Sequence, residues 1–224
     1  MNVGGIVSVL TEGLWNDFIS SLSTHIFGSK TLATLQSIIT TADTVGSFTE
    51  SWSTVQTVYG VLQDLTGKEK IAYNRLISDQ LYNFFISYKE FTSVANTIKL
   101  SPKGRFAIAM PAAISYTAST IAFVEGTTVA DTITDSANGL LTAGITGNMA
   151  LEVTGSVANN SIFELAKAVG GTLTLRPSYD LTAEIAGNPI TLSQVQLFNI
   201  ISVELKGGIK SVAHHYEVLL EVVK

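Results

Sequence analysis

The sequence contains no cysteine, which excludes a disulfide framework, thiolate metal ligands and a cysteine nucleophile. It is also poor in charge, because only 14% of its 224 residues are charged, against about a quarter in an ordinary soluble protein. Hydroxyl side chains take their place, with 26 threonines and 22 serines. Since charge usually keeps a monomer dispersed, this composition indicates a protein that covers much of its surface with copies of itself.

The net charge of −5 is unevenly distributed along the chain. Residues 1–67 carry a net −4, residues 68–105 a net +4 and residues 106–224 a net −5. A nucleic-acid-binding face needs a larger positive excess without so much acid elsewhere, so we do not expect nucleic acid as a partner. The basic stretch is better explained as packing against an acidic one, in the same chain or in a neighbouring copy.

The first residues do not form a secretory signal. Residues 1–10 contain no basic region, their apolar run is short, and Glu12 follows soon after. We therefore expect assembly without a cleavable signal peptide, in a virion or an extracellular structure, and otherwise a cytoplasmic location. Apolar spacing over residues 11–27 predicts a helix that packs on the rest of the protein.

Apolar residues at alternating spacings of three and four predict a long antiparallel helical hairpin over residues 31–98. The first segment follows this spacing from Leu32 to Leu62, with one slip near Gly46, and Gly67 is placed to end it. The positions of the second segment are Ile77, Leu81, Phe84, Tyr88, Phe91, Ala95 and Ile98. We expect the two helices to pack as a coiled coil.

Six aromatic residues define the expected packing and assembly seam of this hairpin. They are Trp52, Tyr59, Phe84, Phe85, Tyr88 and Phe91. Phe84, Tyr88 and Phe91 should face Trp52 and Tyr59 across the helix pair. Phe85 lies beside the seam and should contact the N-terminal helix or another subunit.

The composition changes at Leu100–Gly104, where proline and glycine end the helical pattern. The uncharged run 106–124 has the length of a membrane span, but Pro111 and its alternating pattern predict two buried strands. Direct membrane insertion is therefore not expected. The further candidate strands are 128–134, 140–146, 149–154, 172–176, 179–185, 190–193, 197–205 and 214–223. Residues 161–169 are predicted to be helical.

These patterns predict an α+β fold of two domains. Residues 1–100 would form a helical domain, with one helix followed by the helical hairpin. Residues 101–224 would form an antiparallel β-sandwich of jelly-roll or Greek-key type, because eight to ten short strands occur without alternating long helices.

No motif for catalysis, a metal or a cofactor is present in the sequence. His214 and His215 are adjacent in a predicted strand and would point to opposite faces, so together they cannot chelate one ion. Asp131 and Asp135 lie in ordinary turn sequence. Asn159 begins an Asn-Asn-Ser triplet and is a possible glycan acceptor.

The sequence therefore favours a non-enzymatic, self-assembling structural protein, such as a virion coat or appendage subunit, whose partners are copies of itself. Two alternatives remain open. One is a soluble β-sandwich module that binds a ligand, and the other is a membrane-active, pore-forming protein whose helical hairpin rearranges into lipid. An enzyme is less favoured, since no catalytic constellation is visible.

Overall fold

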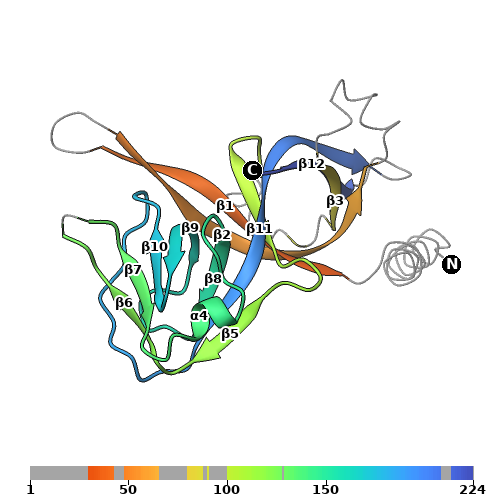
Figure 1. Cartoon of the computed structure of the whole chain (residues 1–224). Coiled ribbons are helices and arrows are strands. Elements are labelled where there is room, and N and C mark those ends of the chain that lie inside the picture. The colour runs from red at the N-terminus through yellow and green to blue at the C-terminus, as the bar shows by residue number, and fades with distance from the viewer. Residues whose placement is uncertain are drawn as a thin grey trace, which may run out of the picture.

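The computed structural model describes residues 30–42, 48–65, 80–87, 90, 100–127, 129–207 and 213–223 (Figure 1). These residues form nearly all antiparallel β-structure with one short helix. The strands are β1 (Thr31–Ala42), β2 (Phe48–Asp64), β3 (Leu81–Ser87), β4 (Gly104–Ile108), β5 (Ser115–Ala118), β6 (Ile121–Val124), β7 (Thr132–Asp135), β8 (Ala150–Thr154), β9 (Ile162–Val169), β10 (Thr172–Leu175), β11 (Ile190–Gly207) and β12 (Ala213–Val222), and the helix is α4 (Gly139–Thr142).

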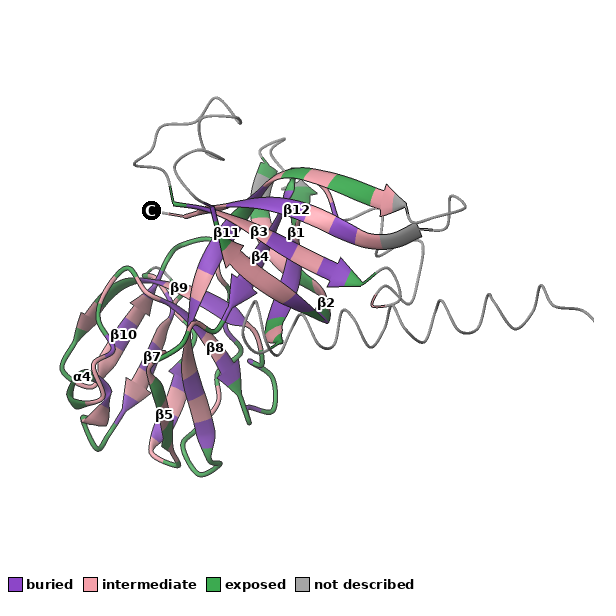
Figure 2. Ribbon diagram, turned by 90° about the vertical axis from the view of Figure 1, so that its right-hand side faces the viewer, coloured by how far each residue is buried: buried purple, intermediate pink, exposed green. Residues whose placement is uncertain are grey.

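Six strands close into a ring in the order β12, β3, β2, β1, β4 and β11, and β11 pairs back to β12. All neighbours in this ring are antiparallel. Figure 2 shows buried residues in purple: β4 of the ring, which lies between β1 and β11, is buried throughout, whereas burial alternates in short strands such as β7 and β10. The interior is centred on Phe84, Phe106 and Phe198, and the rings of Phe84 and Phe106 pack edge to face at 5.2 Å.

Gly60 allows the ring to close over Phe84. A Cβ atom at position 60 would lie 2.5 Å from the ring of Phe84 and 2.7 Å from the carbonyl oxygen of Phe85. Only glycine permits this close approach of the β2 backbone to its neighbour β3.

The second lobe is built on the first half of β11. Residues 190–195 of β11 pair with β5 on one side and with β8 on the other, and the sheet continues through β9, β10, β7 and β6. An isolated bridge between Phe123 and Glu184 covers the edge of β6. The core of this lobe comes entirely from residues between Ile121 and Leu192 in the sequence. The lobe therefore has an apolar centre of its own, separate from that of the ring.

The helical hairpin predicted over residues 31–98 is wrong, and so is the α+β class that depended on it. Its described parts are β1, β2 and β3, and the described residues contain no coiled coil. Spacings of three and four arise easily in a chain that is 46% hydrophobic, whereas the local propensity favours strands. Twelve of the 34 residues from 31 to 64 are threonine or serine, and β-branched threonine, valine and isoleucine prefer strands. The helix predicted over residues 11–27 lies outside the described residues.

The predicted antiparallel, sandwich-like β-structure is confirmed in this coarse form. Three local predictions in the second half are wrong. The candidate strand 140–146 overlaps α4, the candidate strand 179–185 contains only the isolated bridge at Glu184, and the helix expected over residues 161–169 is β9. Alanine, glutamate and lysine give this segment helix propensity, but burial of Ile162, Phe163 and Leu165 between β8 and β10 prevails.

The predicted domain boundary at Ser101 runs through the ring. Strands β1, β2 and β3 precede it, and β4, β11 and β12 follow it. The uncharged run 106–124 contributes to three strands, β4, β5 and β6. Within the described ranges, every helix is too short or too polar to cross a lipid bilayer.

Candidate assembly surface

β1 and β2 form a ribbon that extends beyond the ring. β4 pairs with β1 only over Ala33–Ser37, and β3 pairs with β2 only over Gly60–Asp64. The distal ribbon, which we define as Ile38–Ala42 and Phe48–Trp52, therefore consists of two strands that pair only with each other among the described strands. Figure 1 shows it, in orange and brown, reaching away from the ring. Its five residue pairs span about 17 Å, at about 3.4 Å per residue.

The distal ribbon exposes large apolar side chains on both faces. Phe48 is 68% exposed, Ile39 46% and Ile38 38%. Since Ile38 and Ile39 are neighbours in one strand, they point to opposite faces of the ribbon. Folded proteins usually protect such an edge with lysine or proline, but the distal ribbon contains neither, and its only charged residue is Glu50. It is thus an unprotected, apolar and β-prone edge.

Arg105 joins the ribbon and the ring to the second lobe. Its guanidinium group lies 4.1 Å from the centre of the Trp52 ring and donates a hydrogen bond from Nε to Gln36 Oε1 at 2.8 Å. It also donates from Nη1 to Glu164 Oε1 and from Nη2 to the Tyr179 hydroxyl at 3.2 Å. Arg105 is only 2% exposed. We call these five residues the interlobe cluster.

The interlobe cluster fixes the protonation states of its acidic members. Burial alone would raise the pKa of Glu164, but the hydrogen bond and positive charge of Arg105, helped by Tyr179 and Arg176, lower that pKa below its ordinary value. Burial is the main cause that raises the pKa of Tyr179 to about 12. The protonated Tyr179 hydroxyl donates to Glu164 Oε1 at 2.8 Å. The cluster is closed to substrate and lacks an exposed nucleophile, so its chemistry is that of a clamp between the lobes.

A cleft of about 170 Å³ lies between the ribbon and the second lobe. Its walls are mostly hydroxyl-bearing or polar. The lining residues are Thr34, Thr54, Thr57, Glu152, Val153, Thr154, Asn160, Ser161 and Ile162. Burial raises the pKa of Glu152, and no described residue offers its carboxylate a hydrogen bond or a positive charge. The cleft could hold a small polar molecule, but it presents no catalytic pair.

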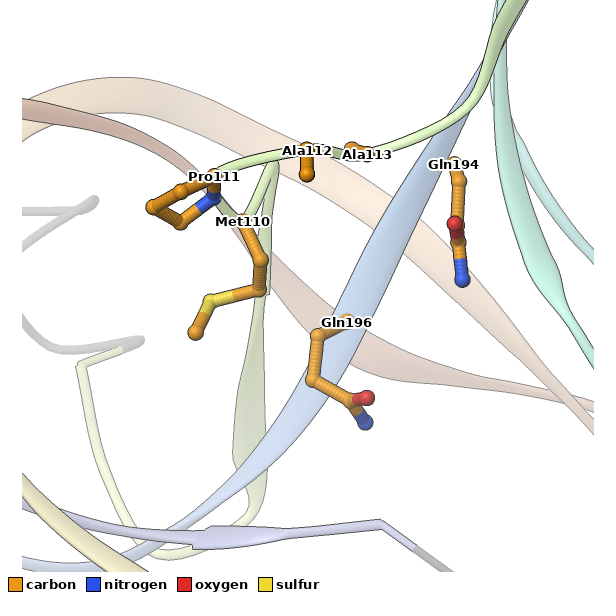
Figure 3. Close-up of a pocket in the computed structure, with 6 residues that line it drawn as sticks. All are labelled: Met110, Pro111, Ala112, Ala113, Gln194 and Gln196. Atoms are coloured by element: carbon orange, nitrogen blue, oxygen red, sulfur yellow. The ribbon is translucent and has the colours of Figure 1, made fainter.

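A second small pocket, also about 170 Å³, lies where the 110–113 turn passes β11 (Figure 3). Figure 3 shows Met110 and Pro111 on one side of it and the amides of Gln194 and Gln196 on the other. Gln194 accepts a hydrogen bond from the Ile114 N–H at 3.3 Å, and Gln196 donates to backbone carbonyls. The pocket contains no charged group and no group suited to catalysis.

The structure separates the aromatic residues that the sequence had placed in one seam. Phe84 is fully buried inside the ring, opposite Leu62 of β2, and does not face Trp52. Trp52 instead covers Arg105, and Tyr59 is 52% exposed. Phe85 lies on the outer side of β3, with its ring 6.2 Å from that of His215. Tyr88 and Phe91 lie outside the described residues.

Asn159, the possible glycan acceptor, is only 4% exposed. Its amide nitrogen donates to the Thr182 carbonyl at 2.9 Å and to Glu184 at 3.3 Å, and its side-chain oxygen accepts from the Thr182 N–H. A glycan on this nitrogen would have to displace those bonds, so the structure argues against glycan addition after folding.

His215 lies beside acidic groups at the outer face of β12. Its Nε2 is 3.3 Å from Glu217 Oε1, and Lys206 contacts both Glu204 and Glu217. His214 is in the same strand, and its side chain lies outside the described part of the structure. Among the described residues, no three potential ligands gather as a metal site would require.

Sequence reasoning had not singled out Arg105, Glu164 or Tyr179. Arg105 is 59 residues from Glu164 and 74 residues from Tyr179 in the sequence, so only the fold brings Arg105 to these partners. A weak signal did exist, because Arg105 sits in an otherwise apolar run, Gly104–Ile108, where a charge needs a partner.

In sequence comparisons, the chain matches no protein-family model and no curated protein.

Proposed function

We propose that the protein is a non-enzymatic structural subunit that assembles with copies of itself, as a coat or appendage subunit does. The observation that carries this proposal is the distal ribbon, a two-stranded projection with apolar side chains on both faces. A two-stranded ribbon without further packing is marginally stable in water at best. A contact with a neighbouring subunit would bury Ile38, Ile39 and Phe48 and stabilise it.

Low charge supports the same proposal. With 14% charged residues and 48 hydroxyl-bearing ones, the chain has little of the charge that keeps crowded monomers apart. The interlobe cluster would contribute by holding the ribbon at a fixed angle to the second lobe, so that each subunit presents its ribbon in the same way.

The test is the state of association of the full-length protein. Sedimentation velocity over a hundredfold concentration range, with negative-stain microscopy, should reveal oligomers or ordered particles. Phe48→Ser should weaken association at least tenfold while the far-UV spectrum stays unchanged. Val157→Ser is the matched control, because Val157 is 80% exposed but lies outside the strands of the distal ribbon. A wild-type chain that stays monomeric throughout would contradict the proposal.

A soluble binding module is the second candidate, and the cleft around Glu152 is the observation that favours it. A monomeric protein whose melting temperature rises with a small polar or cationic ligand, and whose response is lost in Glu152→Gln, would favour this function. The pore-forming alternative no longer has the helical hairpin on which it rested.

A further inference from the structure

We infer that the distal ribbon pairs edge to edge with the same ribbon of a second copy, β1 against β1, in an antiparallel register centred on Thr40. This inference rests on the proposed function and specifies its contact. The residues of β1 beyond Ser37 have no described strand on the side away from β2. Their outward N–H and C=O groups are therefore available to another strand.

The sequence of this edge suits pairing with itself. Ser37–Ala42 reads Ser-Ile-Ile-Thr-Thr-Ala, which is uncharged, rich in β-branched residues and free of proline and glycine. Short segments of this composition are those that pair readily as strands between chains. Because the segment carries no charge, its copy meets no repulsion, whereas a strongly charged partner would find no complementary group on it.

The other edge of the ribbon is less suitable. Glu50 lies on β2, and pairing through β2 would bring two copies of its carboxylate onto adjacent strands. The same edge is also engaged near the ring, where Glu90 accepts a hydrogen bond from the Tyr59 N–H at 3.1 Å. With β1 in the centre, the order becomes β2, β1, β1 and β2. The two Glu50 residues are then three strand spacings apart, about 14 Å, and largely screened.

The register follows from symmetry and from the length of the free edge. In a two-fold antiparallel pair, one residue must lie opposite its own copy. Thr40 is the middle residue of Ile38–Ala42, so centring on it pairs all five residues. Within one subunit, Ile38 pairs with Trp52 and Ala42 pairs with Phe48. Centring on Thr40 places Ile38 opposite Ala42 of the second copy. The four residues Trp52, Ile38, Ala42 and Phe48 then form one row across the four strands, the last two from the second copy. The most exposed aromatic residue of the ribbon would thereby join an apolar row.

Single cysteines test this register cleanly, because the protein contains no cysteine of its own. In full-length Thr40→Cys, the two Cα atoms should lie within about 6 Å and a disulfide should form under mild oxidation. Ser51→Cys is the matched control, because Ser51 pairs with Ile39 on the neighbouring strand and its two copies would be about 16 Å apart. Dimer on a non-reducing gel should be at least tenfold more abundant for Thr40→Cys.

A second variant gives a readout without oxidation. Thr40→Lys is made together with Glu50→Gln, because Glu50 lies opposite residue 40 on β2 and would neutralise a lysine there. It places two ammonium groups opposite each other on the symmetry axis and should raise the dissociation constant at least tenfold relative to Glu50→Gln alone. High salt should partly restore association, because the repulsion is screened. Ser51→Lys should change the dissociation constant by less than threefold, and both variants should keep the wild-type far-UV spectrum.

The outcomes separate this inference from the proposed function. Assembly of the wild-type chain without a Thr40→Cys cross-link, or with a stronger cross-link at Ser51→Cys, would overturn the edge pairing and leave the structural role standing. A chain that remains monomeric in sedimentation would overturn both.

Discussion

Replacing Arg105 by methionine should weaken the connection between the ring and the second lobe. The substitution keeps most of the apolar length of the side chain but leaves Glu164 with only the more distant cation of Arg176, whose Nε lies 3.7 Å from Glu164 Oε2, and leaves Gln36 Oε1 without its donor. Removing one partner of a buried ion pair costs about 3–5 kcal/mol. The Glu164 side chain is 15% exposed, so we expect the lower half of that range, about 3–4 kcal/mol.

The assay is urea unfolding of wild type and Arg105→Met, monitored by fluorescence and far-UV dichroism. With a typical slope of about 2–3 kcal/mol per molar, the midpoint should fall by roughly 1–2 M. Glu164→Gln removes the other charge and should cost less, because the neutral amide can still pair with its neighbours. The double variant should cost clearly less than the sum of the two single ones, because the two residues act on each other.

The effect of pH gives an independent check. Glu164 has a lowered pKa in the folded protein, so its contribution to stability is present above its ordinary pKa and is lost as pH falls through the folded value. Without Arg105, the pKa of Glu164 should rise, because burial is then opposed only by Tyr179 and Arg176, and the variant should lose less stability on acidification than the wild type. A cost below about 1 kcal/mol, strict additivity, or unchanged pH dependence in Arg105→Met would refute this reasoning.

Two further predictions concern single side chains. Phe84→Ala should destabilise the protein by about 3–5 kcal/mol in urea unfolding, because it empties the centre of the ring. Phe85→Ser on the outer side of β3 should cost less than half as much. Equal costs would contradict the faces assigned to the two residues. Glu152→Gln should raise the melting temperature at neutral pH, because burial raises the pKa of Glu152 and its charged form destabilises the fold there. The two melting curves should converge below about pH 4.5, where the wild-type carboxyl group is protonated, and a gap that persists in acid would count against this explanation.

The sequence predicted β-structure well where turns interrupt short apolar runs. The expected strands 149–154 and 172–176 correspond closely to β8 and β10, because glycine and asparagine mark their ends. The sequence-based prediction was wrong over residues 31–64, where β1 and β2 are long strands without such interruptions. In an uninterrupted stretch of this length, apolar residues can match the three-and-four spacing of a helix by chance. Local propensity was the better guide there, since threonine and valine lose side-chain freedom in a helix.

The assembly surface could be predicted only as a tendency. Low charge and abundant hydroxyl groups indicated self-association, but not which residues would mediate it. Trp52 and Phe84 were expected to touch and lie instead on different faces of the sheet, because pairing register, not sequence spacing, decides which side chains meet. Ile38, Ile39 and Phe48 become notable only once the ends of β3 and β4 leave the distal ribbon unpaired.

The continuous course of β11 through both units has a mechanical consequence. Its first six residues belong to the second lobe and the remainder to the ring, so no flexible linker joins the two parts at this point. A pull applied to the distal ribbon would pass from β1 to β4 and from β4 to β11 through the hydrogen bonds between neighbouring strands. Because β11 runs without a break from the second lobe into the ring, the same pull would reach the second lobe through the backbone of β11 itself. We therefore expect the ring and the second lobe of one subunit to move together under load.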